Sequence, residues 1–383
     1  MLVGVVGKTN VGKSAFFSAA TLVDVEISNR IFTTIKPNTG AAYARAQCPH
    51  VELKLTCAPR NSKCANGIRL IPVQLMDVAG LVPGAHEGRG LGNQFLDDLR
   101  QANALVNVID VSGGTDSEGQ PVPPGSHDPA EDITLLETEF ERWLAAIVAK
   151  GLVKPAYSKE PAEERLARQL SGLGVTVLDA KRALEKVGED KNRLAHEIRL
   201  LSKPMLVAAN KIDVPGADKL YEKLKKQMPN HMIVPCSAES ELALRKAAAA
   251  GAIDYTPGAS EFKILKELPE KQRGALNFIK TAVLDKFGST GVQQAIDAAT
   301  FDLLKQIVVY PVEDENKFAN HYGQVLPDAI LLPQGAGAYD LAAKIHTDLA
   351  KAFVCGVDAR TKRKLGRETP LKSGDIVRIV AKA

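Results

Sequence analysis

The sequence lacks several features that would point to particular classes of protein. None of its 383 residues falls in a run of 18 consecutive apolar residues, which excludes a transmembrane helix. An apolar strand pattern begins at the second residue and leaves no room for a signal peptide, so we expect a cytoplasmic protein without membrane association. Five cysteines, an odd number without a regular framework, fit a reducing compartment.

The overall charge is small as well. A formal net charge of +4 does not by itself indicate a nucleic-acid partner, and neither an internal repeat nor a low-complexity tail is present. Hydrophobic residues make up 45% of the chain and charged residues 25%, as in ordinary soluble proteins. The length suggests two or three domains, each large enough to have its own core.

Short apolar runs that do not alternate with polar residues predict central strands of a parallel sheet, buried on both faces. They cover residues 2–6, 71–76, 105–109, 204–209 and 232–234. Helical segments separate most of them, which predicts an α/β fold with a doubly wound sheet. Ligand loops of such sheets lie at the carboxyl ends of the strands, so residues that directly follow these runs are candidates for the site.

The strongest motif follows the first predicted strand. Residues 7–14 fit the phosphate-loop pattern GxxxxGK[ST], and a predicted helix over 15–20 supplies the expected context. In this pattern backbone N–H groups surround the α- and β-phosphates, the Lys13 ammonium reaches the β- and γ-phosphates, and the Ser14 hydroxyl binds Mg²⁺. The predicted nucleotide-binding residues here are Gly7, Lys8, Thr9, Asn10, Val11, Gly12, Lys13, Ser14 and Ala15.

Three further motifs end later strands in the order that a guanine-nucleotide site requires. In the first, DVAG at 77–80, we expect Asp77 to hold Mg²⁺ through water and the Gly80 N–H to contact the γ-phosphate. In the second, NKID at 210–213, Asp213 can accept two hydrogen bonds from guanine, which adenine cannot donate. Lys211 should cover the base, and Asn210 should tie this loop to the phosphate loop. The third is Ser237-Ala238, the backbone position expected to meet guanine O6.

Together these motifs resemble P-loop GTPases of the translation-factor-related class, and two segments narrow the resemblance to the YchF-type, Obg-like family. Residues 32–38 (FTTIKPN) resemble the switch I of Obg-related proteins, which implies that Thr34 coordinates Mg²⁺. Residues 77–86 (DVAGLVPGAH), continued by GRGLGNQFL at 88–96, are similar to the YchF-type switch II. The family also carries a helical insertion and a C-terminal TGS domain of β-grasp fold.

We therefore predict three domains. The GTPase domain covers 1–112 and 202–300, and the helical insertion covers 113–201, opening with an irregular Gly/Pro-rich loop at 113–129. Helical patterning over 133–148 and again over 160–201 predicts an antiparallel pair of helices in the insertion, either as a cover for the sheet or as an arm for a partner. A small α+β domain at 305–383, the TGS-like domain, should contain strands near 306–312, 329–332 and 375–380 and one helix at 339–353.

The chain departs from the wider family in ways that bear on mechanism. Its base-recognition motif is intact, as in the archaeal and fungal branch, which favours GTP over ATP. Leu81 stands where Ras-like switches have the glutamine that orients water, so slow hydrolysis assisted by a partner or cation is expected. Asn10 matches a K⁺ ligand of related enzymes, or it makes a hydrogen bond that stabilises the loop. His86 either approaches the γ-phosphate or is an exposed loop histidine.

Two further groups of residues have alternative interpretations. Cys48, His50, Cys57 and Cys64 have the chemistry of a tetrahedral zinc site but no CxxC knuckle, and reduced, partly buried thiols are the alternative. Near the C-terminus a basic run either forms a solvated loop or contacts phosphates of ribosomal RNA or tRNA. It comprises Arg360, Lys362, Arg363, Lys364 and Arg367. Base-stacking aromatic residues are missing from this stretch of sequence, which argues against specific readout.

The resulting hypothesis is a monomeric, cytoplasmic, Mg²⁺-dependent GTPase switch, with K⁺ as a candidate second ion, that hydrolyses GTP to GDP and associates with the ribosome. Five glycines between 80 and 92 suit a segment that reorders on hydrolysis. One alternative is an ATP-preferring Obg-like enzyme of stress regulation. The other is a nucleotide-dependent binding module whose hydrolysis is vestigial.

Overall fold

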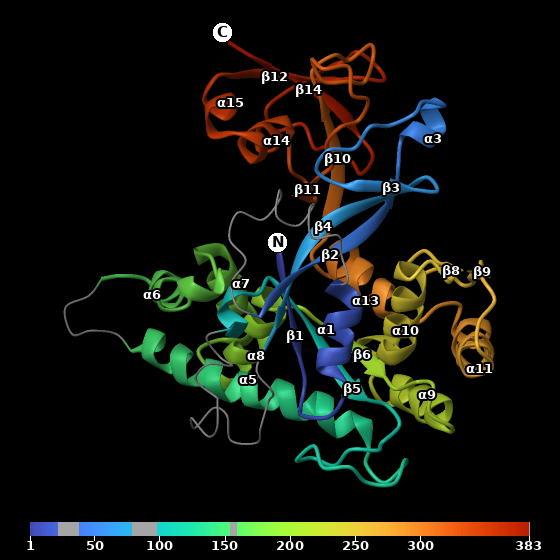
Figure 1. The fold of residues 1–383 in the computed structure, drawn as a ribbon. Helices are drawn as coiled ribbons and strands as arrows, with labels where there is room; N and C mark the ends of the chain where they lie inside the picture. Colours follow the sequence, from blue (N-terminus) through green and yellow to red (C-terminus); the bar gives the residue numbers. More distant parts are fainter. Residues whose placement is uncertain (22–37, 79–97, 154–158, 383) are drawn as a thin grey trace. The chain divides into compact units, whose positions relative to one another are not determined.

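The computed structural model describes residues 1–21, 38–78, 98–153 and 159–382 (Figure 1). Among these, unit 1 comprises 1–21, 38–40, 74–78, 98–153 and 159–295, and unit 2 comprises 41–73 and 296–382. The predicted domain boundaries remain a prediction, but residues 41–73, expected in the GTPase domain, group with the C-terminal residues. No described helix combines the length and apolar character that a membrane crossing needs.

A seven-stranded sheet with the order β2-β4-β1-β5-β6-β7 carries the phosphate loop, and β3 pairs with β4 outside this path. The strand β1 runs parallel to both β4 and β5, and β5, β6 and β7 are parallel neighbours. The bounds are β1 Leu2–Val6, β2 Thr39–Gln47, β3 Lys63–Ala65, β4 Ile68–Asp77, β5 Ala104–Asp110, β6 Met205–Asn210 and β7 Met232–Pro235. All five predicted strands are confirmed: β1, β4, β5 and β6 consist mostly of buried apolar residues, whereas the residues of β7 are only partly buried.

Several helices of unit 1 begin with a side-chain cap. Asp128 caps α5 by accepting a hydrogen bond from the Ala130 N–H, Pro129 is the first helical residue, and Thr176 and Asp179 form a capping box at α7. The bounds are α1 Lys13–Thr21, α5 Pro129–Leu152, α6 Ala162–Gln169, η2 Ser171–Leu173, α7 Val177–Val187, α8 Lys191–Ser202, α9 Ala217–Gln227, α10 Ala238–Ala249, α11 Glu270–Ile279, η3 Lys280–Leu284 and α12 Asp285–Phe287, with the short strands β8 Ile253–Asp254 and β9 Lys263–Ile264. The next helix, α13 Val292–Ala298, crosses the division between the units.

The helical insertion is confirmed, but the expected antiparallel pair is wrong. The described residues of the insertion contain four α-helices, α5 to α8, of which the 24-residue α5 is the longest (Figure 1). They share a core that includes Leu144, Leu166 and Ile198. The stretch expected as one helix over 160–201 is divided because Gly174 and Gly188 adopt positive φ values of 77° and 68° after η2 and α7.

Unit 2 contains a five-stranded sheet in the order β11-β10-β14-β12-β13, in which β10 and β14 are parallel and the other pairs are antiparallel. The bounds are α3 His50–Leu53, η4 Ala299–Leu303, β10 Gln306–Val312, β11 Ile330–Pro333, α14 Ala338–Ile345, α15 Thr347–Lys351, β12 Phe353–Asp358, β13 Lys364–Leu365 and β14 Ile376–Ala381. The single helix expected over 339–353 is interrupted at His346, whose φ of −161° is extended, and Phe353 already begins a strand. The predicted α+β character is confirmed.

Candidate functional site

The phosphate loop connects β1 to α1 and depends on two glycines with positive φ. A Cβ atom at Gly7, where φ is 147°, would lie 2.3 Å from the Val108 carbonyl oxygen of the neighbouring strand. At Gly12, where φ is 90°, it would lie 2.3 Å from Asn210 Nδ2. Both positions require glycine because an L side chain would meet strain and a close contact. The loop backbone therefore lies directly against β5 and β6.

A cavity of about 550 Å³ lies over this loop. Its lining comes from three segments that are distant in sequence: the phosphate loop, the end of β6 and the start of α10. The lining residues are Lys8, Thr9, Asn10, Gly12, Lys13, Ser14, Ala15, Asn210, Lys211, Asp213, Val214, Ala238 and Glu239. The structure thus brings most of the residues singled out for nucleotide binding to one cavity, while Gly7, Val11 and Ser237 lie beside it in the same segments.

Asn210 holds the three segments together. Its Nδ2 donates to the Val11 carbonyl oxygen at 2.8 Å, which is the connection between the two loops that the sequence predicts. Its Oδ1 accepts from the Ala238 N–H at 2.9 Å. In this structure the Ala238 N–H, expected to meet guanine O6, therefore serves Asn210 instead. Ser237 is fully buried, and its hydroxyl caps α10 by accepting a hydrogen bond from the Ser240 N–H.

Lys211 and Asp213, the other two residues of the NKID motif predicted to bind the base, differ in their contacts. Lys211, at a φ of 64°, donates from Nζ to Asp110 Oδ2 at 2.8 Å. Asp110 is fully buried at the end of β5, and its Oδ1 also accepts from the Ser112 hydroxyl. The Asp213 carboxylate makes no hydrogen bond or ion pair with the described residues and lines the cavity. Asp110 was not singled out from the sequence, although it directly follows a predicted strand.

Lys13 and Asp77 form a loosely satisfied pair on the phosphate side. Lys13 Nζ donates to the Val78 carbonyl oxygen at 2.8 Å and lies 3.8 Å from Asp77 Oδ1. Burial lowers the pKa of Lys13, and the Asp77 charge opposes this. Burial likewise raises the pKa of Asp77, and Lys13 opposes it. Asp77 Oδ1 is buried without a hydrogen bond to any described residue, so the site favours an additional cation or donor there.

Lys8 departs from its expected role. Its ammonium is buried and donates to Asp132 Oδ1 at 2.7 Å, and also to the carbonyl oxygens of Thr115 and Asp116. Asp132 Oδ1 lies 2.8 Å from His127 Nε2 as well. The side chain of Lys8 therefore anchors the loop to the start of α5, and only its backbone N–H remains for a phosphate. The sequence showed no signal for this ion pair, because the partners are 124 residues apart.

The Gly/Pro-rich loop at 113–129 lies against the phosphate loop, which the sequence did not predict. Asn10 Nδ2 donates to the Gly119 carbonyl oxygen at 2.9 Å, and the Thr9 hydroxyl donates to the Glu118 carbonyl oxygen at 3.3 Å. A Cβ at Gly119 would lie 2.0 Å from Thr9 Oγ1, so glycine is required here as well. The Asn10 contact is the loop-stabilising hydrogen bond considered above, and it leaves Oδ1 as the atom with which Asn10 would bind a cation.

Several predicted residues lie outside the described residues. They include Thr34 and the rest of the switch I segment up to residue 37, together with Gly80, Leu81, His86 and the continuation of switch II. Their roles stay predictions.

The basic run in unit 2 is only partly free. Arg360 donates to the Gly374 carbonyl oxygen and to Glu52, and the exposed Lys362 donates from Nζ to the Glu315 carbonyl oxygen. Arg363 and Lys364 are exposed as well. The expectation that aromatic residues are missing near the run holds only along the sequence. The Arg367 guanidinium lies 3.6 Å from the centre of the Tyr339 ring, and Lys362 Nζ lies 5.6 Å from that of Phe318.

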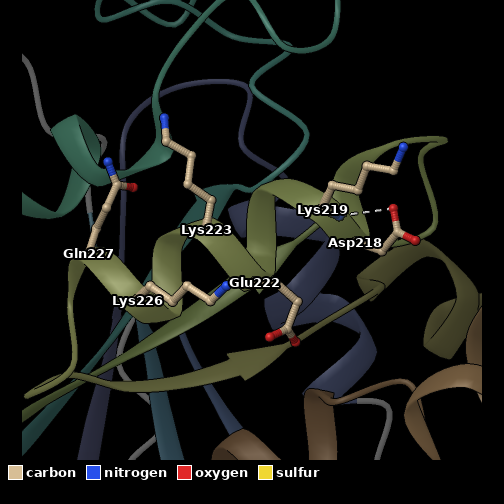
Figure 2. A pocket seen from close by; sticks show the side chains of 6 residues that line it. All are labelled: Asp218, Lys219, Glu222, Lys223, Lys226 and Gln227. Atoms are coloured by element: carbon tan, nitrogen blue, oxygen red, sulfur yellow. Dashed lines mark hydrogen bonds between the residues drawn. The ribbon is translucent and has the colours of Figure 1, made fainter.

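A second hollow, shown in Figure 2, runs along α9 and has only charged or amide side chains from this one helix. Two of them, Lys223 and Gln227, donate to Asp128 Oδ2 at the cap of α5. A further hydrogen bond joins the Lys219 N–H to Asp218 Oδ1. These contacts describe a solvated helix face that fastens α9 to α5, without converging groups for a ligand.

Three family models match successive parts of the chain. Residues 2–150 match the 50S ribosome-binding GTPase family, and residues 208–314 match the G4 motif-containing domain of Obg-like, YGR210-like GTPases. Residues 323–381 match the TGS domain. The order of these matches along the chain is the one expected from the sequence motifs.

Curated relatives cover nearly the whole chain. An uncharacterised GTP-binding protein of Methanocaldococcus jannaschii is 48% identical over 100% of this chain and 99% of its own length. One of Schizosaccharomyces pombe is 38% identical over 92% of both chains. The ribosome-binding ATPase YchF of Escherichia coli O157:H7 is 28% identical over 92% of this chain and 86% of its own length.

A solved structure supports the same assignment. A GTP-binding protein from Pyrococcus horikoshii OT3 superposes with a TM-score of 0.80 at 40% identity and covers 100% of both chains. The phosphate loop, the intact NKID motif and the C-terminal TGS domain agree with these matches. The chain belongs to the YchF-type, Obg-like family of GTP-binding proteins with a TGS domain.

Proposed function

We propose that this protein is a Mg²⁺-dependent switch that hydrolyses GTP to GDP and phosphate and associates with the ribosome. The observation that carries the proposal is the Asp213 carboxylate, which has no partner among the described residues and lines the same cavity as Lys13 and Ser14. A carboxylate in this place can accept from both N1–H and N2–H₂ of guanine. Adenine offers no such pair of donors, so GTP is favoured over ATP.

The supports around Asp213 are rigid, which favours selective recognition. Asn210 is hydrogen-bonded at both ends of its side chain. Lys211 is held by the buried Asp110, so its methylene groups can cover one face of the base while the ammonium stays paired. The base site can therefore bind its ligand without first ordering these side chains, which lowers the entropic cost of binding.

The residues on the phosphate side fit a magnesium ion. The exposed Ser14 hydroxyl and the buried Asp77 Oδ1, which has no hydrogen bond to a described residue, are oxygen ligands of the kind that Mg²⁺ prefers, with Asp77 acting through water. From the switch segments, Thr34 is the proposed further Mg²⁺ ligand, and the Gly80 N–H is proposed to contact the γ-phosphate. Bound Mg²⁺ would neutralise charge on the phosphate oxygens. Lys13 would exchange its hydrogen bond to Val78 for the β- and γ-phosphates.

Hydrolysis has to proceed without a glutamine after the DVAG motif, because Leu81 can neither donate nor accept a hydrogen bond. Asn10 is the proposed K⁺ ligand, through Oδ1, and K⁺ there would supply positive charge near the phosphates. His86 is a secondary candidate for contact with the γ-phosphate. These roles predict slow turnover that depends on the monovalent cation.

Two observations favour a ribosomal partner for a cytoplasmic monomer. One is the match of residues 2–150 to the 50S ribosome-binding GTPase family. The other is the exposed basic turn of Lys362, Arg363 and Lys364 within the TGS domain, which suits RNA phosphates. Co-sedimentation with ribosomes should require GTP and weaken steeply with salt, and its absence in both nucleotide states would contradict this part of the proposal.

The decisive experiment measures GTP and ATP affinities of the full chain in K⁺ and in Na⁺. We expect a strong preference for GTP, which Asp213→Asn reduces by about 100-fold or more, since two hydrogen bonds to a charged acceptor contribute about 1.5–3 kcal/mol each. Asp218→Asn, which changes a carboxylate on α9 outside the cavity, is the matched control. Equal wild-type affinities for the two nucleotides would favour the ATP-preferring alternative.

Single-turnover hydrolysis in the two cations tests the mechanism. Turnover should be faster in K⁺, and Asn10→Ala should remove the difference. No hydrolysis in either cation would instead favour a binding module with vestigial activity.

A further inference from the structure

Three cysteines and one histidine of unit 2, all between residues 48 and 64, come together at one point. One ligand atom each of Cys48, His50, Cys57 and Cys64 lies within 4.8 Å of all the others, and Cys64 Sγ lies 3.6 Å from His50 Nδ1. We propose that these four residues bind one Zn²⁺ ion in a closed tetrahedral site. The proposal is independent of the nucleotide site, whose described residues belong to unit 1.

The distances suit a tetrahedral zinc ion. Zinc binds thiolate sulfur at about 2.3 Å and imidazole nitrogen at about 2.0–2.1 Å. At tetrahedral angles these bonds separate sulfur from nitrogen by about 3.6 Å and two sulfurs by about 3.8 Å. The Cys64–His50 distance of 3.6 Å equals the first value, and the upper limit of 4.8 Å leaves only small movements for the rest.

The end of β2, the short helix α3 and the turn between β3 and β4 bring the four side chains together. Cys48 directly follows β2, and His50 begins α3, whose C-cap Lys54 has a left-handed φ of 53°. A two-residue turn with positive φ at Asn66 (50°) and Gly67 (81°) folds β3 back on β4 and sets Cys64 opposite Arg69. Cys57 lies in the coil between. These turns replace the CxxC knuckle that the sequence lacks.

A buried arginine supplies an independent sign of negative charge at this site. Arg69 is fully buried, and its guanidinium donates to Cys48 Sγ at 3.5 Å, to the Ser62 hydroxyl and to the Leu326 carbonyl oxygen. Among the described residues it has no carboxylate partner, and its Nε has no hydrogen-bond partner; the guanidinium carbon lies 5.4 Å from the centre of the Tyr310 ring. Buried charges are normally paired. A zinc ion with three thiolates and one histidine carries one net negative charge, which would complement Arg69.

The segment from residue 48 to residue 64 has little apolar burial of its own that could hold its conformation, which a bound metal ion would stabilise. Between residues 48 and 64 only Cys48, Pro49 and Ser62 are buried, so little apolar burial holds it. Segments with so small a core are commonly stabilised by a metal or a disulfide, and all three cysteines here are free thiols. Four protein ligands leave no open position, so the ion would be structural and not catalytic.

The ion would stabilise one face of the TGS region. The coil that carries Cys57 continues into residues that bond to 325–329 of the same unit: the Ala58 N–H donates to the Val325 carbonyl oxygen at 2.8 Å, and Arg60 pairs with Asp328. Asn61 Oδ1 also accepts from the Ala329 N–H at 2.9 Å. Zinc at the cluster would therefore order the segment that lies along the start of the TGS match at residue 323.

The test measures metal content and coordination in the full chain purified in reductant without chelator. We expect about one zinc ion per chain by mass spectrometry, as a structural site requires. After exchange, Co²⁺ should give the d–d bands of a tetrahedral ion together with a thiolate charge-transfer band. Zinc far below stoichiometry after reconstitution of the reduced chain, or a native disulfide within the cluster, would overturn the proposal.

Variants separate ligation from folding. Cys57→Ser and Cys64→Ser should lower zinc affinity at least tenfold, while Cys57→His, which keeps a permitted ligand type, should retain the metal. Cys355→Ser, which removes a free thiol of β12 outside the cluster, is the matched control. Full zinc content in both serine variants would refute the assignment. Because GTP affinity is measured on the same samples, failure of the zinc site and failure of the nucleotide site remain distinguishable.

Discussion

Two buried cations, Lys8 in unit 1 and Arg69 in unit 2, show how differently the two regions balance charge. The Lys8 ammonium lies 2.7 Å from the Asp132 carboxylate, and both side chains are at least 95% buried. Arg69 is equally buried but faces thiols, a hydroxyl and a carbonyl oxygen. The buried cation of the nucleotide region therefore has a carboxylate partner within the protein, although Asp132 Oδ2 and Thr115 Oγ1 have no hydrogen-bond partner among the described residues. The buried cation of the cysteine region, Arg69, has no carboxylate partner among the described residues.

Breaking the Lys8 pair should have the largest effect on stability. Lys8→Met leaves the Asp132 carboxylate buried without its cation, which should lower the free energy of unfolding by about 3–5 kcal/mol. Urea unfolding of the nucleotide-free chain measures this. Replacing both partners, Lys8→Met with Asp132→Leu, should recover most of the loss, because no charge is left behind.

The comparison is sharpened by Arg69→Met. In zinc-free protein this change should cost clearly less than Lys8→Met, since it strands no carboxylate. In zinc-loaded protein it should cost more than in the zinc-free form. Equal losses with and without zinc would show that the arginine does not respond to the metal.

A smaller effect is expected at Asp77. Its pKa is raised by burial from the usual value of 3.8, so the ionised carboxylate destabilises the nucleotide-free fold, and the penalty grows as pH rises from that value through the raised pKa. Asp77→Asn should therefore raise the melting temperature without nucleotide by a few degrees at neutral pH, with a gain that shrinks toward pH 4. With Mg²⁺ and GTP bound, the wild type should have the higher melting temperature. A variant less stable than wild type in both states would contradict this account.

The smallest effect concerns the basic turn. Replacing Arg363 and Lys364 by alanine removes two exposed charges that make no described ion pair, so stability should change by less than about 0.5 kcal/mol. Ribosome co-sedimentation should weaken, and its dependence on log salt should become shallower by about 1–2. The control is Lys372→Ala, which removes an exposed charge outside the turn and should leave co-sedimentation unchanged.

The sequence predicted the parts of the nucleotide site that depend on contiguous residues. Residues 7–14 and 210–213 directly follow strands whose burial on both faces is visible as unbroken apolar runs. Asp110 and Asp132 were missed because their partners, Lys211 and Lys8, are more than 100 residues away. The helix ends within the insertion were not predicted, because helical patterning continues across Gly174 and Gly188.

By itself the sequence determined the order of strands and motifs, and with it the family and the kind of ligand. A phosphate loop acts through its own backbone, so its function is readable from eight neighbouring residues. Only the tertiary structure decided which side chains meet: Lys8 with Asp132 and Asn10 with Gly119 across more than 100 residues, and the three cysteines with His50 across irregular spacings. Such contacts depend on turns and on strand pairing, which set distances that no local spacing specifies.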